Sequence, residues 1–246
     1  MHPPIRVITM SKTILSQEIG SGHADVLTSS GAINARGRTN IEVRFTGGIA
    51  TDVESIDLAI KPLYRKEDSY RSVGLTTCSI FEGDSRGTGR RETHTSTITV
   101  PPETPGTIGR ISVLGTFEFS TTNKCIEVET YLGITPTPHL YATFYSMFDL
   151  GFGVRDIDCV SSGLYDDLPY AIKLVYEPTA EPFTKSLDTV TLLCRQTEDD
   201  LKVFVVFDEE TSDEPVSERG FETRVSSAQR RDAGDRIREI IERETH

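Results

Sequence analysis

The sequence predicts an all-β protein built from antiparallel β-sandwiches in two halves of similar size. Apolar and polar residues alternate with a period of two, as in Ile41-Glu42-Val43-Arg44-Phe45, which places one strand face on a core and the other in water. Such runs recur about every 10 to 20 residues with no helical pattern between them, which is typical of sandwiches. The pattern breaks once, near the middle, and so divides the chain in two.

The predicted strands follow from these alternating runs. The first half contains runs at 41–46, 56–60, 98–100, 117–119 and 126–129. The second half contains runs at 157–159, 170–176, 190–194, 201–207 and 221–225. The runs at 190–194 and 201–207 flank Glu198-Asp199-Asp200, and this arrangement predicts a hairpin.

A short helix is predicted at the central break. Thr135-Pro136-Thr137-Pro138 ends the first set of strands, because each proline removes a backbone donor. Thr137 is a suitable N-cap and Pro138 a favoured first helical residue. Gly151 supplies the stop. An apolar stripe at helical spacing lies between them, formed by Leu140, Phe144, Met147 and Phe148.

A second helix is predicted in the tail. Ser226-Ser227-Ala228-Gln229 has the form of a capping box, and Ala233, Ile237, Ile240 and Ile241 follow as a narrow apolar stripe. Gly234 costs a helix about 1 kcal/mol relative to Ala, so this helix needs a partner surface. Two alternatives remain open: the stripe docks on the chain's own sandwich, or Ile237, Ile240 and Ile241 bind another protein.

The charge balance limits the class of partner. The chain has 246 residues and a formal net charge of −12, which disfavours electrostatic binding to nucleic acids. No apolar run approaches the roughly 18–20 residues of a transmembrane helix. The N-terminal MHPPIRVITMSK lacks the apolar segment of a secretory signal. We therefore expect a soluble, cytoplasmic protein.

The sequence predicts no catalytic, cofactor-binding or metal-binding residue. Gly83-Asp84-Ser85-Arg86-Gly87 matches the pattern of a hydrolase elbow, but no helical stripe follows it, so a hairpin loop is the preferred interpretation. None of the five histidines has a second His or Cys at ligand spacing. The four cysteines include no Cys-x-x-Cys pair. Cys125, Cys159 and Cys194 lie in or beside alternating apolar runs, which predicts buried, reduced thiols.

Three ordered segments resemble a known family. They are Gly47-Gly48 leading to 52–60 and Tyr64-Arg65, then 98–105, then Thr137-Pro138 with the helix through Met147 to 150–152. In this order and spacing, the chain is similar over residues 12–225 to the SpoOM family of sporulation-control proteins, in the arrestin-like superfamily. One departure is the turn at 120–125, Ser-Thr-Thr-Asn-Lys-Cys, where relatives often carry an acidic, Asp-rich turn.

The resemblance implies a fold and a domain organisation. It implies two arrestin-like (immunoglobulin-like) sandwiches in tandem, at 12–134 and 152–226. A linker with a short helix at 135–151 joins them, and a C-terminal helix or tail occupies 227–246. It also implies a protein with no enzymatic activity.

The predicted function is therefore a non-enzymatic adaptor or scaffold that regulates development or cell division through protein–protein interactions. Cell-division or cytoskeletal proteins are the implied partners, and self-association is left open. One alternative is an arrestin-like trafficking or membrane-surface adaptor. A less favoured alternative is a serine hydrolase that uses Ser85.

Overall fold

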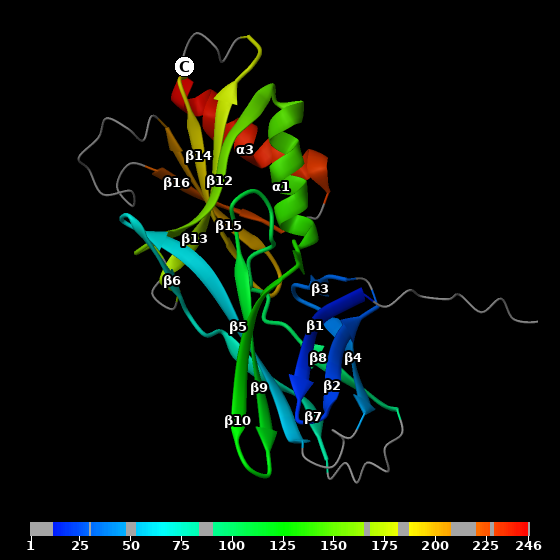
Figure 1. Ribbon diagram of the computed structural model, residues 1–246. Helices are drawn as coiled ribbons and strands as arrows, with labels where there is room; N and C mark the ends of the chain where they lie inside the picture. The colour runs from blue at the N-terminus through cyan, green and yellow to red at the C-terminus, as the bar shows by residue number, and fades with distance from the viewer. Residues whose placement is uncertain are drawn as a thin grey trace, which may run out of the picture.

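The computed structural model describes residues 12–29, 31–47, 53–83, 91–164, 168–181, 187–207, 220–226 and 229–245. Figure 1 shows an elongated molecule, with most strands of the first half at one end and the two helices of the described residues at the other. Strands predominate in the described residues, which confirms the predicted mostly-β class. Among the same residues, no helix has the length and apolar character needed to cross a membrane.

The first half contains two packed sheets. One consists of four antiparallel strands in the order β1 (Lys12–Ile19), β2 (Gly22–Thr28), β4 (Arg38–Gly47) and β8 (Glu92–Thr99). The facing strands are β5 (Val53–Lys66), β7 (Thr76–Glu82), β9 (Val113–Thr121) and β10 (Cys125–Leu132). Ile41, Val43 and Phe45 are at most 1% exposed and share one core cluster with Leu58 and Phe117. The alternation seen in the sequence thus marks a real inward face.

The second half is one sheet covered by two helices. Its strands are β12 (Phe152–Ser161), β13 (Tyr170–Pro178), β14 (Val190–Gln196), β15 (Leu201–Phe207) and β16 (Gly220–Val225). Side chains of α1 (Pro138–Asp149) and α3 (Arg230–Thr245) join the inner-face residues of this sheet in a second core cluster. In the described residues, the helices therefore lie where a second sheet was expected.

Strand β5 belongs to both halves. One edge pairs with β7 and then with β6 (Ser69–Ser72), and the other pairs with β9. Arg65, near the end of β5, then pairs in parallel with Val160 of β12. The described strands β5–β7, β9, β10 and β12–β16 consequently form one ten-stranded sheet that runs through the molecule. At about 3.3 Å per residue, the 14 residues of β5 span roughly 43 Å.

Several details differ from the sequence prediction. The purely antiparallel arrangement is wrong at two places, because β3 (Ile33–Asn34) and β11 (Ile134–Thr135) also pair in parallel. Alternation identifies strands but carries no information on the direction of their partners. α3 begins at Arg230, with Ala233 N donating to Gln229 O at 3.2 Å, so the capping box that starts at Ser226 does not begin the helix.

The predicted domain boundaries at 12–134, 135–151, 152–226 and 227–246 stay a prediction. The two core clusters do not divide the chain at those points, because Tyr64 and Ile111 pack in the second cluster. Tyr64 stacks on Tyr170 of β13 with ring centroids 6.0 Å apart.

Candidate interaction site

Helix α1 forms as its termini predict. The Thr137 side chain accepts a hydrogen bond from Leu140 N, Pro138 stands in the first turn, and Gly151 follows the C-cap with a φ of 86°. The hydroxyl satisfies one of the free N–H groups at the start, and glycine adopts the left-handed conformation without strain. These three residues confirm the predicted helix and its limits.

The buried face of α1 is not the one predicted from its apolar residues. Leu140 and Met147 are fully buried, but Thr143 and Ser146 are buried equally, and Phe148 is 40% exposed. The predicted stripe is therefore wrong at Phe148. Small polar residues occupy the buried face because α3 crosses there at close range.

The contact between the helices explains Gly234. A Cβ placed on this glycine would lie 3.3 Å from the Ser146 Cβ, which is tight for a carbon–carbon contact. Ala233, Ile237 and Ile241 of α3 are fully buried beside it. Gly234 thus weakens the isolated helix but permits close packing on α1. The sequence predicted that α3 needs a surface to pack on, and α1 with the sheet beneath it provides that surface.

The exposed face of α1 is an aromatic stripe without charge. Tyr141, Tyr145 and Phe148 are 39%, 43% and 40% exposed and follow one another along one side of the helix. The Tyr141 and Tyr145 rings stack at 5.9 Å with an interplanar angle of 11°, and Tyr145 and Phe148 lie 6.1 Å apart. We call these three residues the aromatic face.

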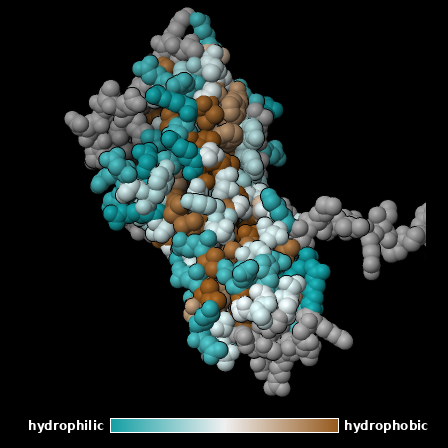
Figure 2. Space-filling model, in the orientation of Figure 1, coloured by the Kyte–Doolittle hydropathy of each residue, from teal (hydrophilic) through white to brown (hydrophobic). Residues whose placement is uncertain are grey.

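A solvated helix normally presents charged residues, and α3 does so. Arg231 pairs with Asp235 and Arg236 with Glu239 on its outer side. In contrast, the twelve residues of α1 include no Lys, Arg or Glu; Asp149 stands at the last position, and His139 is buried. Figure 2 shows hydrophobic residues continuing along the middle of the visible face between hydrophilic margins. Aromatic residues are enriched at protein contact sites relative to the rest of a protein surface.

Buried hydrogen bonds fix α1 on the rest of the fold. Gln196, 2% exposed, accepts from Thr137 N at 3.3 Å and donates through Nε2 to Thr104 O at 2.9 Å. The Tyr176 hydroxyl donates to Phe144 O at 3.3 Å, and burial raises the pKa of Tyr176 well above its ordinary value. The aromatic face is thus carried by a rigidly held helix.

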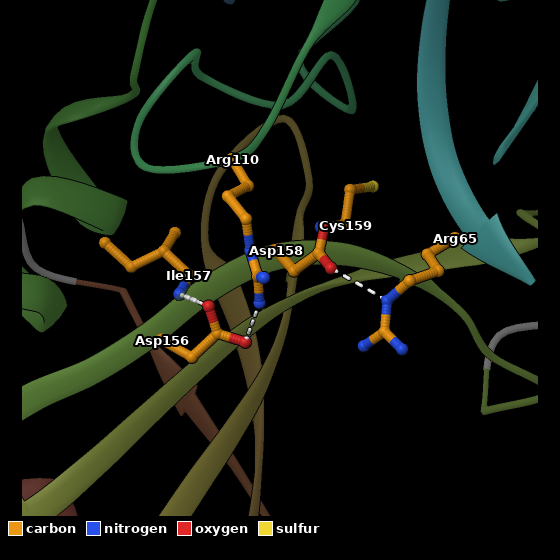
Figure 3. A network of polar contacts seen from close by, with 6 residues as sticks. All are labelled: Arg65, Arg110, Asp156, Ile157, Asp158 and Cys159. Carbon is orange, nitrogen blue, oxygen red and sulfur yellow. Dashed lines mark hydrogen bonds and ion pairs between the residues drawn. The ribbon is translucent and has the colours of Figure 1, made fainter. Parts of the chain in front are cut away.

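A polar network joins the two halves near this helix (Figure 3). Arg65 Nε of β5 donates to Asp158 Oδ2 of β12 at 2.9 Å, and Asp158 Oδ1 accepts from Cys159 N at 2.8 Å. Asp158 is 1% exposed, so Arg65 compensates a buried carboxylate. Arg110 reinforces the junction by pairing with Asp156.

The residues predicted to bind a partner lie in the core. Ile237 and Ile241 are fully buried, and Ile240 packs partly buried against the same cluster. The structure therefore shows the docking of α3 on its own chain. Partner binding by these three residues stays a prediction, and it requires α3 to leave this position.

The described residues do not bring the candidate catalytic serine, histidine and acid together in a catalytic arrangement. Ser85 lies outside the described residues. His94 packs against Phe81 at 4.7 Å, with Nε2 3.6 Å from Glu92 Oε2. A serine, a histidine and an acid do meet on β1 and β2, where Ser16 Oγ and Asp25 Oδ1 both approach His23 Nε2. In a triad the acid orients the other ring nitrogen, so this cluster lacks the required geometry.

The described residues contain no group of three or more His, Cys, Asp or Glu side chains placed to hold a metal ion. Cys159 and Cys194 are buried, and desolvation raises the pKa of both thiols. The prediction for Cys125 is wrong, because its side chain is exposed on β10. A hydrogen bond to Glu118 raises the pKa of Cys125.

Sequence reasoning missed Tyr141 and Tyr145. The prediction for this helix rested on the apolar stripe of Leu140, Phe144, Met147 and Phe148 and did not cover its other side. The available signal was the near absence of charge in a helix that reaches the surface.

The fold is that of a mostly-β protein with two helices packed on one sheet in the described residues and an exposed aromatic face on α1. A family model described as SpoOM protein matches residues 10–211, so the chain belongs to the SpoOM family, as its ordered segments predicted. None of the curated proteins matches the sequence.

The solved structure of Spo0M, a sporulation control protein from Bacillus subtilis, resembles the chain with a TM-score of 0.75 at 20% identity, covering 92% of this chain and 99% of that one. This likeness shows a shared fold. A structure described as pT26-6p has a TM-score of 0.27 at 8% identity, covering 82% of this chain and 49% of that one, which is too low to indicate a common fold.

Proposed function

We propose that this chain is a non-enzymatic, arrestin-like adaptor that works in the cytoplasm through protein–protein contacts, and that the aromatic face is a contact surface. The observation that carries the proposal is the uncharged row of Tyr141, Tyr145 and Phe148 on a firmly held helix. Exposed aromatic residues on rigid elements dominate the energetics of protein interfaces. Membership of the SpoOM family and the fold shared with a sporulation control protein favour a role in cell development or division.

Site-specific photo-crosslinking in the native host tests this function. Tyr145→benzoylphenylalanine is expected to form covalent adducts with a defined protein, identified by mass spectrometry. Tyr70→benzoylphenylalanine is the matched control, because Tyr70 is 54% exposed on β6, away from α1 (Figure 1). Identical adduct patterns from both positions would count against the aromatic face as a contact surface.

A membrane-surface adaptor is the second candidate, and charge argues against it. The net charge of −12 opposes anionic lipid, and α1 carries no Lys or Arg. Flotation of the protein with vesicles of anionic lipid would favour this alternative. The hydrolase alternative is tested with a serine-reactive fluorophosphonate, and labelling lost in Ser85→Ala would support an enzyme.

A further inference from the structure

We propose that the aromatic face of α1 binds a second copy of this chain, with the two α1 helices antiparallel across a two-fold axis. This inference goes beyond the adaptor function, since it requires no other protein. It rests on the symmetry of the aromatic face, on its lack of charge and on the charge carried by the rest of the chain.

The aromatic face is symmetric about its own centre. Tyr141 and Phe148 lie three and a half residues on either side of a point between Phe144 and Tyr145. A two-fold axis through that point places Tyr141 of one copy opposite Phe148 of the other, and sets the two Tyr145 side chains beside each other. A two-fold contact must be complementary to itself, and rings pair well with rings in stacked or edge-to-face geometry.

Electrostatics favours this surface over the other exposed elements for self-association. Two copies with a charge of −12 each repel one another over most of their surface. Antiparallel pairing of the edge strand β10 about Val128, for example, sets Glu127 opposite Glu129 of the second copy, a like-charge pair that is destabilising. Pairing through Tyr141, Tyr145 and Phe148 buries no charge and meets no such opposition.

The available area sets the strength of the contact. At about 40% exposure, each ring offers roughly 60–100 Å² of its 150–250 Å², so the aromatic face contributes roughly 180–300 Å² per copy. Stable complexes bury about 800 Å² per partner. We therefore expect a weak, reversible dimer. Salt should strengthen it, because screening weakens the general repulsion while the contact itself contains no ion pair.

Sedimentation velocity of the full chain between about 5 and 500 µM tests the dimer. The expected result is a concentration-dependent shift from monomer to dimer that increases with ionic strength. Tyr145→Glu, which brings two carboxylates together at the axis, should weaken association at least tenfold, whereas Tyr70→Glu should leave it unchanged. Circular dichroism confirms that both variants remain folded. A monomer at every concentration, or equal dimerisation of Tyr145→Glu and wild type, would overturn the proposal.

Crosslinking with a bismaleimide tests the antiparallel geometry. In a background of Cys78→Ser and Cys125→Ser, Tyr145→Cys should crosslink to its own copy. Tyr141→Cys should crosslink strongly only when mixed with Phe148→Cys. Efficient crosslinking of Tyr141→Cys to itself contradicts the antiparallel arrangement. Heterologous adducts at Tyr145 in the host, together with a monomer in solution, would refute the dimer and leave the proposed function intact.

Discussion

Replacement of Ile237 by alanine tests whether α3 is an integral part of the fold. Ile237 is fully buried between α1 and the sheet, and Ile237→Ala removes three carbons. At about 0.8 kcal/mol per carbon, the lost burial amounts to about 2.4 kcal/mol, and the cavity left behind adds to it. We expect the free energy of unfolding to fall by about 3 kcal/mol.

The assay is urea denaturation followed by circular dichroism, with the slope m compared between variants. Arg238→Ala is the matched control, because the neighbouring Arg238 is exposed on the same helix and its replacement should change stability by less than about 0.5 kcal/mol. Ile240→Ala, at a partly buried position, should lie between the two. Equal stability of Ile237→Ala and Arg238→Ala would refute the docking of α3 on its own chain.

Three further changes probe the junction and the surface. Gln196→Met removes the buried donor to Thr104 O and the acceptor at the start of α1, and chemical denaturation should show a loss of about 2–4 kcal/mol. Arg65→Met leaves a buried carboxylate without its cation; since Arg65 is itself partly exposed, we expect a loss of about 1–3 kcal/mol by the same assay, and no loss would contradict a structural role. Glu118→Gln weakens the hydrogen bond that raises the pKa of Cys125 and also removes the negative charge beside it, so at pH 7.5 the thiolate fraction and the rate of reaction with Ellman's reagent should both increase; an unchanged rate would refute this cause.

The strands and the central helix were predictable because their signals are local. Ile41 to Phe45 alternate along one strand, and Thr137 with Pro138 begins a helix whatever the chain does elsewhere. Both the strand alternation and the helix start depend only on residues that are neighbours in sequence. The family was predictable for a related reason, since the order of such segments is itself a sequence property.

The aromatic face was not predictable in the same way, because the orientation of α1 depends on a residue almost ninety positions away. Gly234 admits Ser146 at close range, and this turns Thr143 inward and Phe148 outward. The sequence of α1 alone does not predict the contact between Ser146 and Gly234. The exposure of Cys125, in contrast, was predictable, because Cys125 lies on the same face of β10 as Glu127 and Glu129 and opposite Ile126 and Val128.

The passage of β5 from one core to the other limits how the protein can be dissected. A fragment that starts at residue 152 lacks Tyr64 and also lacks β5, the strand that pairs with β12. A fragment that ends at residue 134 lacks β12, so the end of β5 around Arg65 loses its pairing partner on the β12 side. A piece that starts at residue 152 therefore lacks part of the second hydrophobic core, whereas every residue of the first core lies within 12–134, so the second half should not fold without the first. Limited proteolysis should accordingly release no stable fragment that contains the second half alone.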